Sequence, residues 1–237
     1  MKLLQFQAAS ISVNINFFNK KKIIITGHTG FKGSWLLAWL SKSNAKLVGI
    51  SDRKLDNPSH YNFISNIKHK SYLIDIRNKK KLEKIVLNFK PDFIFHLAAQ
   101  SLVKKSVKNP SLTWGTNLFG TLNMLEIIKK LKNKCSIVFI TSDKCYKNIE
   151  TSKGYKETDI LGGKDPYSAS KAATEILIHS HYKTFFERKK NIRFATARAG
   201  NVIGGGDWSE SRIIPDCIKS WVANRPIVIR NPNSTRP

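Results

Sequence analysis

Cysteine is scarce in this sequence, and long apolar runs are lacking. The 237 residues include three cysteines, Cys135, Cys145 and Cys217, with no CxxC pair among them. An odd number of scattered thiols does not build a disulfide framework, so we expect a reducing, cytoplasmic location. No apolar run reaches the roughly 20 residues that a membrane-spanning helix needs. We therefore expect no membrane partner.

Acidic residues are also few. Asp and Glu number 16 against 41 Lys and Arg, which gives a formal net charge of +25. Such an excess raises the possibility of a nucleic-acid or membrane-surface partner. The lysines are dispersed along polar faces of expected helices, however, which indicates a solvated surface and no nucleic-acid partner. A positive field would still favour an anionic substrate and cofactor.

Internal repeats and low-complexity linkers are absent, and the apolar pattern is regular. Short apolar runs alternate with longer amphipathic stretches, as in βαβ units around a parallel sheet. We therefore expect an α/β fold with a doubly wound parallel sheet of Rossmann type. The expected strands are 23–26, 46–50, 93–97, 136–141, 193–198 and 227–230, and the expected helices are 33–43, 79–89, 115–131, 167–188 and 213–222.

A glycine-rich turn joins the first expected strand to the first expected helix. Gly27, Gly30 and Gly33 follow one another at intervals of three, in the strand–turn–helix context of a dinucleotide-binding fingerprint. They permit a tight turn, close approach to a pyrophosphate and close helix packing, in that order. The amides at the helix start would point at phosphate. Residues 51–54 (SDRK) offer both an acid for NAD and basic groups for NADP, so the choice between them stays open.

Tyr167 and Lys171 form a second candidate site at the start of an expected helix. They are four residues apart and therefore lie on one face. A phenol titrates near pH 10, at about the value of free tyrosine, and acts as a base only if its anion is stabilised. A neighbouring ammonium and a positive nicotinamide would do so. Tyr167 is then expected to take a hydroxyl proton while hydride leaves for the cofactor.

Several motifs resemble those of extended short-chain dehydrogenases/reductases of the NAD-dependent epimerase/dehydratase family. They are residues 26–33 (TGHTGFKG), 96–100 (HLAAQ) and 142–144 (SDK), together with the Tyr167/Lys171 pair. More narrowly, GHTGFKGSWL, TSDKCY, PYSASKAATE, ARAGNVIGGGDW and RIIPD resemble the CDP-glucose 4,6-dehydratase family, from about residue 17 to residue 237.

The resemblance also implies a domain organisation. Members of that family continue past residue 237, so we expect a C-terminally truncated chain. Its parts would be a loose leader at 1–14, an NAD-binding Rossmann domain at 15–200 and a partial substrate-binding region at 201–237. A homodimer or a higher homo-oligomer is implied as well.

The activity implied by the resemblance is that of a hydro-lyase. CDP-glucose would become CDP-4-keto-6-deoxyglucose and water through transient oxidation by bound NAD. Tyr167 would remove the C4 hydroxyl proton, Ser142 would hydrogen-bond the C4 oxygen, and Asp143 would protonate the departing C6 hydroxyl. Lys144 stands where related dehydratases carry a glutamate, and its role as C5 base or as a charge that stabilises the C5 enolate stays open. The pathway implied is the formation of deoxy sugars for cell-surface polysaccharide.

The candidate binding residues lie in the glycine loop and at the ends of expected strands. For the cofactor they are Gly27, Thr29, Gly30, Phe31, Lys32, Gly33, Asp75, Ile76, Leu97, Ala98 and Ala99, with Tyr167 and Lys171. For the CDP-sugar they are Gln100, Asn201, Arg212 and Arg230, the two arginines as anion partners. The six histidines form no ligand set, so no metal is expected.

Two other functions stay open from the sequence. A sugar-nucleotide epimerase or reductase of the same fold needs Tyr167 and Lys171 but not Asp143 and Lys144, and loss of water from the substrate separates it from a dehydratase. A catalytically silent dinucleotide-binding protein that binds nucleic acid through its lysines would show salt-dependent DNA binding. The presence of Tyr167, Lys171 and Asp143 argues against it.

Overall fold

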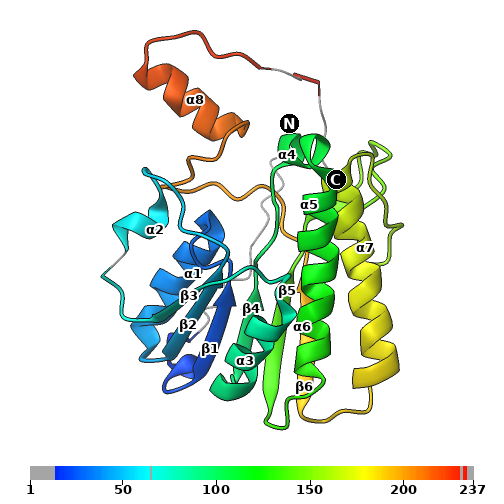
Figure 1. Ribbon diagram of the computed structural model, residues 1–237. Helices are drawn as coiled ribbons and strands as arrows, with labels where there is room; N and C mark the ends of the chain where they lie inside the picture. Colours follow the sequence, from blue (N-terminus) through cyan, green and yellow to red (C-terminus); the bar gives the residue numbers. More distant parts are fainter. Residues whose placement is uncertain (1–13, 65, 230–231, 234–237) are drawn as a thin grey trace.

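A computed structural model describes residues 14–64, 66–229 and 232–233. At its centre lies a parallel sheet of six strands in the order β3-β2-β1-β4-β5-β6, with helices on both faces (Figure 1). The strands are β1 (Lys22–Thr26), β2 (Lys46–Ser51), β3 (Lys70–Leu73), β4 (Phe93–His96), β5 (Cys135–Ile140) and β6 (Ile192–Ala197). The expected α/β fold with a doubly wound parallel sheet is confirmed.

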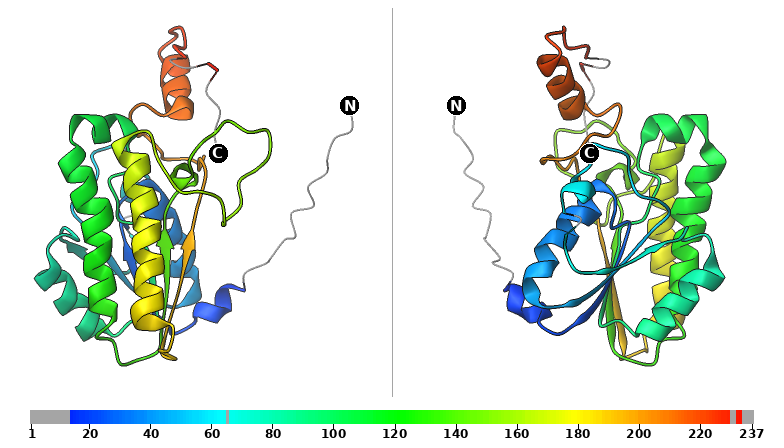
Figure 2. Two further views of the ribbon diagram at one scale, coloured as in Figure 1. Left: turned by 90° about the vertical axis from the view of Figure 1, so that its right-hand side faces the viewer. Right: turned by 60° about the vertical axis from the view of Figure 1, so that its left-hand side comes forward.

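Long helices cover the two faces of the sheet. Helix α1 (Phe31–Leu40) lies on one face, and α3 (Lys79–Phe89), α6 (Gly120–Ile128) and α7 (Pro166–His181) lie on the other (Figure 2). Strand β1 is buried on both sides: Ile23 and Ile25 pack towards α1, whereas Ile24 packs towards α3 and α6. A continuous apolar run is what a parallel strand covered by helices requires.

Shorter elements connect these layers. They are η1 (Ile15–Phe18), η2 (Ser41–Ser43), α2 (His60–Phe63), α4 (Val103–Lys108), α5 (Pro110–Trp114), η3 (Gly115–Phe119), η4 (Asp143–Cys145), η5 (Tyr182–Phe186) and α8 (Ile213–Val222). The expected helix at 115–131 is therefore the end of a longer run that begins at Pro110. Helix α8 stands apart from the sheet, beyond the carboxyl ends of the strands (Figures 1 and 2).

Two expectations about strands are wrong. Residues 227–229 form no strand, and Ile227, Val228 and Ile229 are exposed. An apolar run becomes a strand only beside a pairing partner, and no strand pairs with these three residues in the described part of the chain. Strand β3 was not expected, because its sequence, KSYL, is polar and its side chains are largely exposed at the sheet edge.

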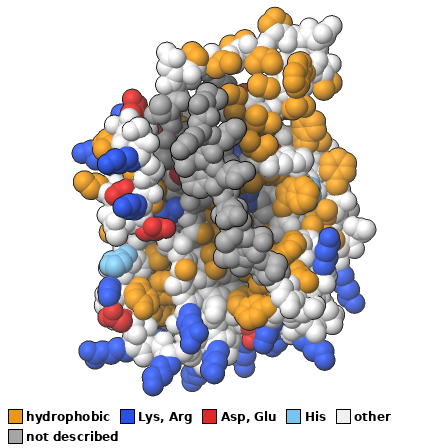
Figure 3. Space-filling view, turned by 180° about the vertical axis from the view of Figure 1, so that it is seen from behind, with side chains coloured by type: hydrophobic (Ala, Val, Ile, Leu, Met, Phe, Trp, Pro, Cys, Tyr) orange, Lys and Arg blue, Asp and Glu red, His pale blue; other side chains and the backbone are white. Residues whose placement is uncertain are grey.

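Exposed lysines gather at the amino-terminal end of the sheet. Lys21, Lys46, Lys90 and Lys134 lie where strands begin, and the blue side chains along the lower edge of Figure 3 follow this end of the molecule. The functional loops lie at the opposite end. Among the described residues, no helix is long and apolar enough to cross a membrane.

The order of the strands creates a crevice at their carboxyl ends. From β1 the chain proceeds outwards through β2 and β3, and then returns to β4 on the other side of β1. Ligands of open α/β sheets bind at such a switch point. The loops that follow β1, β4, β5 and β6 all open at this edge.

Candidate active site

The glycine loop is fixed by very close backbone packing. Gly27 has a φ of +75°, and a Cβ on it would lie 2.9 Å from the amide nitrogen of Ala98. A Cβ on Gly33 would lie 2.0 Å from the carbonyl oxygen of Gly27. Only glycine fits at these two positions, and helix α1 therefore begins directly against the end of β1.

The amino-terminal end of α1 offers amides to an anion. Gly30 is the N-cap residue, and it has no side chain to accept hydrogen bonds from the first amides of the helix. The first N–H groups of a helix have no partner within it, and together with the helix dipole they bind phosphate. The turn formed by Gly27, Gly30 and Gly33 is a cradle without side chains, and it leads into a helix start whose amides have no side-chain cap. This arrangement fits the pyrophosphate of a dinucleotide.

A buried histidine ties the glycine loop to β2 and β3. Nδ1 of His28 lies 2.9 Å from Oγ of Ser51, and Nε2 lies 2.8 Å from Oγ of Ser71. Burial, followed by the charge of His69, lowers the pKa of His28 to about 4. Thr29 adds a hydrogen bond from its hydroxyl to the carbonyl of Arg53, at 2.7 Å. The loop is thus held by uncharged hydrogen bonds.

Leu97 and Ala98 border the glycine loop at Gly27, and the role of residues 97–99 in cofactor binding stays a prediction. The amide of Leu97 donates to the carbonyl of Thr26, and that of Ala98 donates to its hydroxyl, both at 3.1 Å. The candidate residues Asp75 and Ile76 follow β3, the strand at the edge of the sheet. The Arg77 guanidinium binds the Asp75 carboxylate at 2.6 Å and lowers its pKa, while Ile76 is buried beneath Gly120.

Gln100 turns its side chain into the protein. Its Nε2 donates to the carbonyl of Leu102 at 3.1 Å and to the hydroxyl of Thr113 at 2.9 Å, and its Oε1 accepts from the amide of Leu102 at 2.7 Å. The side chain is buried. These contacts give Gln100 a structural role, and its role in substrate binding stays a prediction.

Helix α7 presents Tyr167 and Lys171 on one buried face. The Asp165 carboxylate caps the helix by accepting from the amides of Tyr167 and Ser168, both at 3.0 Å, and Pro166 occupies the first turn. One turn later, Nζ of Lys171 donates to the carbonyl of Ile140 at 3.1 Å. The helix is thus anchored to the end of β5.

The ammonium of Lys171 lies in an unusual electrostatic environment. Burial, and next the charge of Lys32, lower the pKa of Lys171 to about 8, whereas Glu175 and Cys145 act to raise it. The group is still mostly protonated at pH 7. A buried cation of this kind stabilises an adjacent phenolate.

The segment 142–144 forms a tight turn directly after β5. Ser142 and Asp143 are buried, and the Ser142 hydroxyl donates to Oδ1 of Asp143 at 2.9 Å. The amide of Lys144 also donates to that oxygen, at 2.8 Å. The amide of Asp143 donates to the carbonyl of Ala199 at 3.1 Å. The carboxylate is thereby placed at the carboxyl edge, between β5 and β6.

Lys32 interacts electrostatically with charged groups from three other segments. Burial and the charge of Arg212 lower the pKa of Lys32, and the charge of Asp143 raises it. Lys32 also lowers the pKa of Lys171, so the start of α1 lies within electrostatic reach of both α7 and Arg212. Arg212 itself pairs with Asp207 at 3.3 Å.

Of the two remaining substrate candidates, the structure describes one, Asn201. Asn201 is exposed on the segment that follows β6, whereas Arg230 lies outside the described residues. A loop between them packs on α1: the indole of Trp35 donates to the carbonyl of Gly205 at 3.0 Å and stacks on His60 with ring centroids 4.2 Å apart. This contact was not predicted, because it joins segments 170 residues apart.

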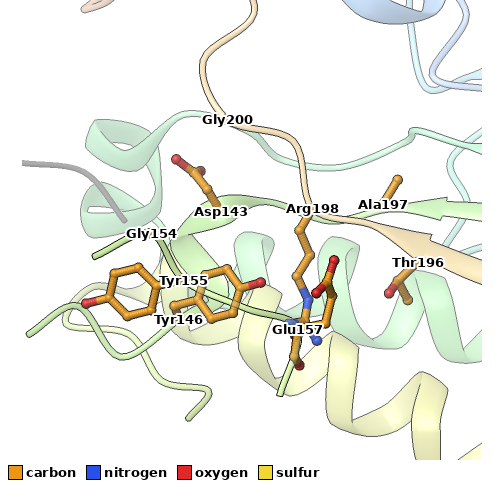
Figure 4. A pocket seen from close by; sticks show the side chains of 9 residues that line it. All are labelled: Asp143, Tyr146, Gly154, Tyr155, Glu157, Thr196, Ala197, Arg198 and Gly200. Atoms are coloured by element: carbon orange, nitrogen blue, oxygen red, sulfur yellow. Dashed lines mark hydrogen bonds between the residues drawn. The ribbon is translucent and has the colours of Figure 1, made fainter. Parts of the chain in front are cut away.

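A cavity of about 550 Å³ adjoins Asp143 (Figure 4). Its walls come from the turn after β5, the loop that precedes α7, and the end of β6 with the residues that follow it. They are Asp143, Tyr146, Gly154, Tyr155, Glu157, Thr196, Ala197, Arg198 and Gly200. Within the described ranges, no three side chains of the metal-binding types lie close enough to hold an ion.

The fold and these residues together define the class of the chain: a Rossmann-type domain with the glycine loop and Tyr–Lys pair of an extended short-chain dehydrogenase/reductase. The chain belongs to the family described as GDP-mannose 4,6 dehydratase, whose model matches residues 24–200.

Individual relatives agree with this family. The chain is 42% identical over 230 residues to CDP-glucose 4,6-dehydratase of Salmonella typhimurium, which covers 95% of this chain and 64% of the relative. It is 32% identical over 225 residues to dTDP-D-glucose 4,6-dehydratase of Dictyostelium discoideum, which covers 88% and 50%. The chain thus spans about half to two thirds of these relatives' lengths.

Among solved structures, the chain is similar to UDP-glucuronic acid 4-epimerase from Bacillus cereus in complex with UDP-glucuronic acid and NAD. The two share 26% identity, with a TM-score of 0.75, over 88% of this chain and 65% of the other. Dehydratases and epimerases therefore share this architecture, and the side chains at the carboxyl edge must distinguish them.

Proposed function

We propose that this chain carries the cofactor-binding and catalytic part of a sugar-nucleotide 4,6-dehydratase, a hydro-lyase that converts CDP-glucose to CDP-4-keto-6-deoxyglucose and water. The observation that carries the proposal is the buried carboxyl of Asp143, which stands next to Lys144 at the edge where α7 presents Tyr167 and Lys171. An epimerase needs the tyrosine and lysine alone. The 42% identity to a CDP-glucose 4,6-dehydratase supports the choice of substrate.

The cofactor is proposed to be NAD, with the choice over NADP left to a binding measurement. The cradle formed by Gly27, Gly30 and Gly33 and the uncapped start of α1 would hold its pyrophosphate. Bound NAD supplies a transient hydride acceptor, which takes the C4 hydride of the sugar and gives it back at C6. The other groups proposed to line it are Thr29, Phe31, Lys32, Asp75, Ile76, Leu97, Ala98, Ala99, Tyr167 and Lys171.

Tyr167 and Lys171 would carry out the oxidation at C4. The Tyr167 phenolate accepts the proton of the C4 hydroxyl, and the protonated Lys171 stabilises that phenolate. Ser142 is proposed to donate a hydrogen bond to the C4 oxygen. The carbonyl formed at C4 makes the proton on C5 acidic, which prepares the elimination.

Asp143 and Lys144 would carry out the elimination. A proton leaves C5, the C6 hydroxyl departs with a proton from Asp143, and one water molecule is lost. Lys144 either takes the C5 proton as a neutral amine or, as a cation, stabilises the C5 enolate while a water molecule takes that proton. A proton would return to C5 when the hydride returns to C6. A Lys144→Arg variant separates the two roles, because arginine keeps the charge and cannot act as a base.

The substrate's diphosphate is proposed to bind at Asn201, Arg212 and Arg230, in the region that begins at residue 201. The position of Arg212 near Lys32 supports this, since both cations would face an anion there. We further propose a homodimer or higher homo-oligomer and a role in lipopolysaccharide O-antigen sugar synthesis, both of which rest on the family resemblance. A cytoplasmic location is proposed from the few scattered cysteines.

The activity test uses purified protein, CDP-glucose and a catalytic amount of NAD. Because this chain spans 64% of the Salmonella relative, the assay also includes a chimera that adds the part of the relative that the chain does not cover. Product lighter than substrate by one water, abolished by Tyr167→Phe and unaffected by Tyr182→Phe at the far end of α7, supports the proposal. An epimer of unchanged mass would show the alternative, an epimerase. No product from either protein, with cofactor still bound, would remove the CDP-glucose assignment.

A further inference from the structure

A buried ion pair lies behind the tyrosine–lysine pair. Glu175 follows Lys171 by one turn of α7, and its side chain is 5% exposed. One carboxylate oxygen accepts hydrogen bonds from the Thr196 hydroxyl at 3.1 Å and from Nη2 of Arg198 at 3.0 Å. The other accepts from the Thr141 hydroxyl. The carboxylate thus joins α7 to the ends of β5 and β6 without contact with solvent.

Two successive turns of α7 hold two successive residues of the chain. Lys171 binds the carbonyl of Ile140, and Glu175 binds the hydroxyl of Thr141. The next residues are Ser142 and Asp143. The place where Asp143 leaves the sheet is therefore set by the helix that also carries Tyr167.

Arg198 extends the same network to the loop that precedes α7. Its Nη1 donates to the carbonyl of Glu157 at 3.0 Å, and its guanidinium lies 5.0 Å from the ring centroid of Tyr146. Tyr146 in turn stacks on Tyr155, with centroids 5.1 Å apart. Figure 4 shows Arg198 between these rings and Glu157. The segment that joins Asp143 to Tyr167 is thereby held by Arg198 at Tyr146 and at Glu157.

We propose that Glu175 and Arg198 are positioning residues, which hold Asp143 in the correct place relative to Tyr167 and Lys171. This inference rests on the proposed dehydratase function. Neither side chain touches the reacting atoms. Their part is to keep the elimination acid and the oxidation base on one rigid frame, where a displacement of about 1 Å is enough to reduce turnover strongly.

The carboxylate of Glu175 has a second effect, on Lys171. The groups that face Lys171 are Lys32 from α1, His96 from β4, Cys145 from η4 and Glu175 from α7 itself. Burial and Lys32 lower the pKa of Lys171, and Glu175 raises it. Loss of the Glu175 charge therefore lowers that pKa further, and Lys171 loses its proton at a lower pH.

The two effects are separable with two variants. Glu175→Gln removes the charge and disturbs the network, whereas Thr141→Val removes one hydroxyl and leaves the ion pair intact. Both are measured in the protein that is active in the assay above, with kcat and KM followed from pH 6 to about pH 10, a range that spans the pKa of Lys171 at about 8. Glu126→Gln, in the surface pairs with Lys129 and His181, is the matched control.

For Glu175→Gln we expect kcat to fall at least about tenfold with little change in KM, and the alkaline limb of kcat to move about one pH unit lower. For Thr141→Val we expect the fall in kcat without the move of the limb. Glu126→Gln should leave both unchanged. Glu175→Gln with wild-type kcat and a wild-type alkaline limb would overturn the inference, as would a Thr141→Val variant of full activity if Glu175→Gln does not fold.

If the wild type does not dehydrate CDP-glucose, the proposed function is wrong. The positioning role is then tested separately, by measuring amide hydrogen exchange. The amide of Asp143, bonded to Ala199, should then exchange faster in Glu175→Gln than in Glu126→Gln. Equal exchange in the two variants would contradict the positioning role independently of any activity.

Discussion

Gly33 lies so close to Gly27 that a Cβ on Gly33 would stand 2.0 Å from the carbonyl oxygen of Gly27. The obstacle is backbone, so it cannot move aside as a flexible side chain would. The contact fixes where α1 begins relative to the end of β1, and hence where the amides of the helix start point.

The first prediction follows from this contact. Gly33→Ala should weaken NAD binding at least tenfold and lower the free energy of unfolding by about 2 kcal/mol or more, because the turn must shift to accept the methyl group. Titration calorimetry and urea unfolding measure the two effects. Gly154→Ala, whose Cβ would meet nothing within 4 Å, is the matched control. Wild-type NAD affinity in Gly33→Ala would show that the cradle has been placed wrongly.

A second prediction concerns the cap of α7. Asp165→Ala should reduce stability by about 1 kcal/mol, since two amides and the Ser168 hydroxyl lose their acceptor. Asp165→Asn, which keeps a capping oxygen, should recover most of that loss. Urea unfolding of the wild type and the two variants measures these differences in stability. Equal stability of the alanine and asparagine variants would contradict the capping role.

A third prediction concerns acid stability. Burial lowers the pKa of His96 to about 3 and of His28 to about 4, so both stay neutral in the native state while the unfolded chain takes up protons below about pH 6.5. Stability should therefore be fully present above pH 6.5 and fall as the pH drops towards 4. Each histidine contributes at most about 1.4 kcal/mol per pH unit in this window.

The comparison that isolates this effect uses urea unfolding at pH 7 and pH 5. His96→Asn should show a shallower loss between the two than the wild type, whereas His179→Asn, at an exposed position of α7, should follow the wild type. If all three proteins lose the same stability, buried neutral histidines do not account for the acid sensitivity.

A fourth prediction separates the two half-reactions. Asp143→Asn should still oxidise C4, because Tyr167 and Lys171 are intact, but should not expel the C6 hydroxyl efficiently. Reduced nicotinamide should then accumulate and be visible by its absorbance, with kcat for dehydration lower by at least about 100-fold. Lys108→Gln, at the exposed end of α4, should behave as wild type. Rapid dehydration by Asp143→Asn would take the acid role away from that carboxyl.

Much of the fold could be predicted, because buried parallel strands carry a strong local signal. The run of three isoleucines in β1 and the glycines after it predicted both the strand and the turn. The edge strand β3 had no such signal, since its stability comes from pairing of Val48 with Lys70 and of the residues beside them. The apolar run at 227–229 had the signal, but it pairs with no strand in the part of the chain that the structure describes.

The candidate site was predicted unevenly for a similar reason. Asp143 was predicted at the carboxyl edge because it follows a parallel strand, and Tyr167 and Lys171 were predicted to share one helix face because they are four residues apart. Glu175 and Arg198 were not predicted, since their contact joins α7 to the end of β6 across 23 residues. The spacing of four between Lys171 and Glu175 was the one signal that pointed to a shared face. The inward turn of Gln100 depends on Thr113, and no local pattern indicated it.

Conversion of CDP-glucose carrying deuterium at C4, with the product analysed by mass, decides whether this chain belongs to a dehydratase. We expect a product that has lost one water and kept the deuterium, now at C6, because the C4 hydride returns there. A product of unchanged mass that keeps the C6 hydroxyl would contradict the dehydratase and identify an epimerase. Loss of water together with loss of the deuterium to solvent would contradict the internal return of hydride.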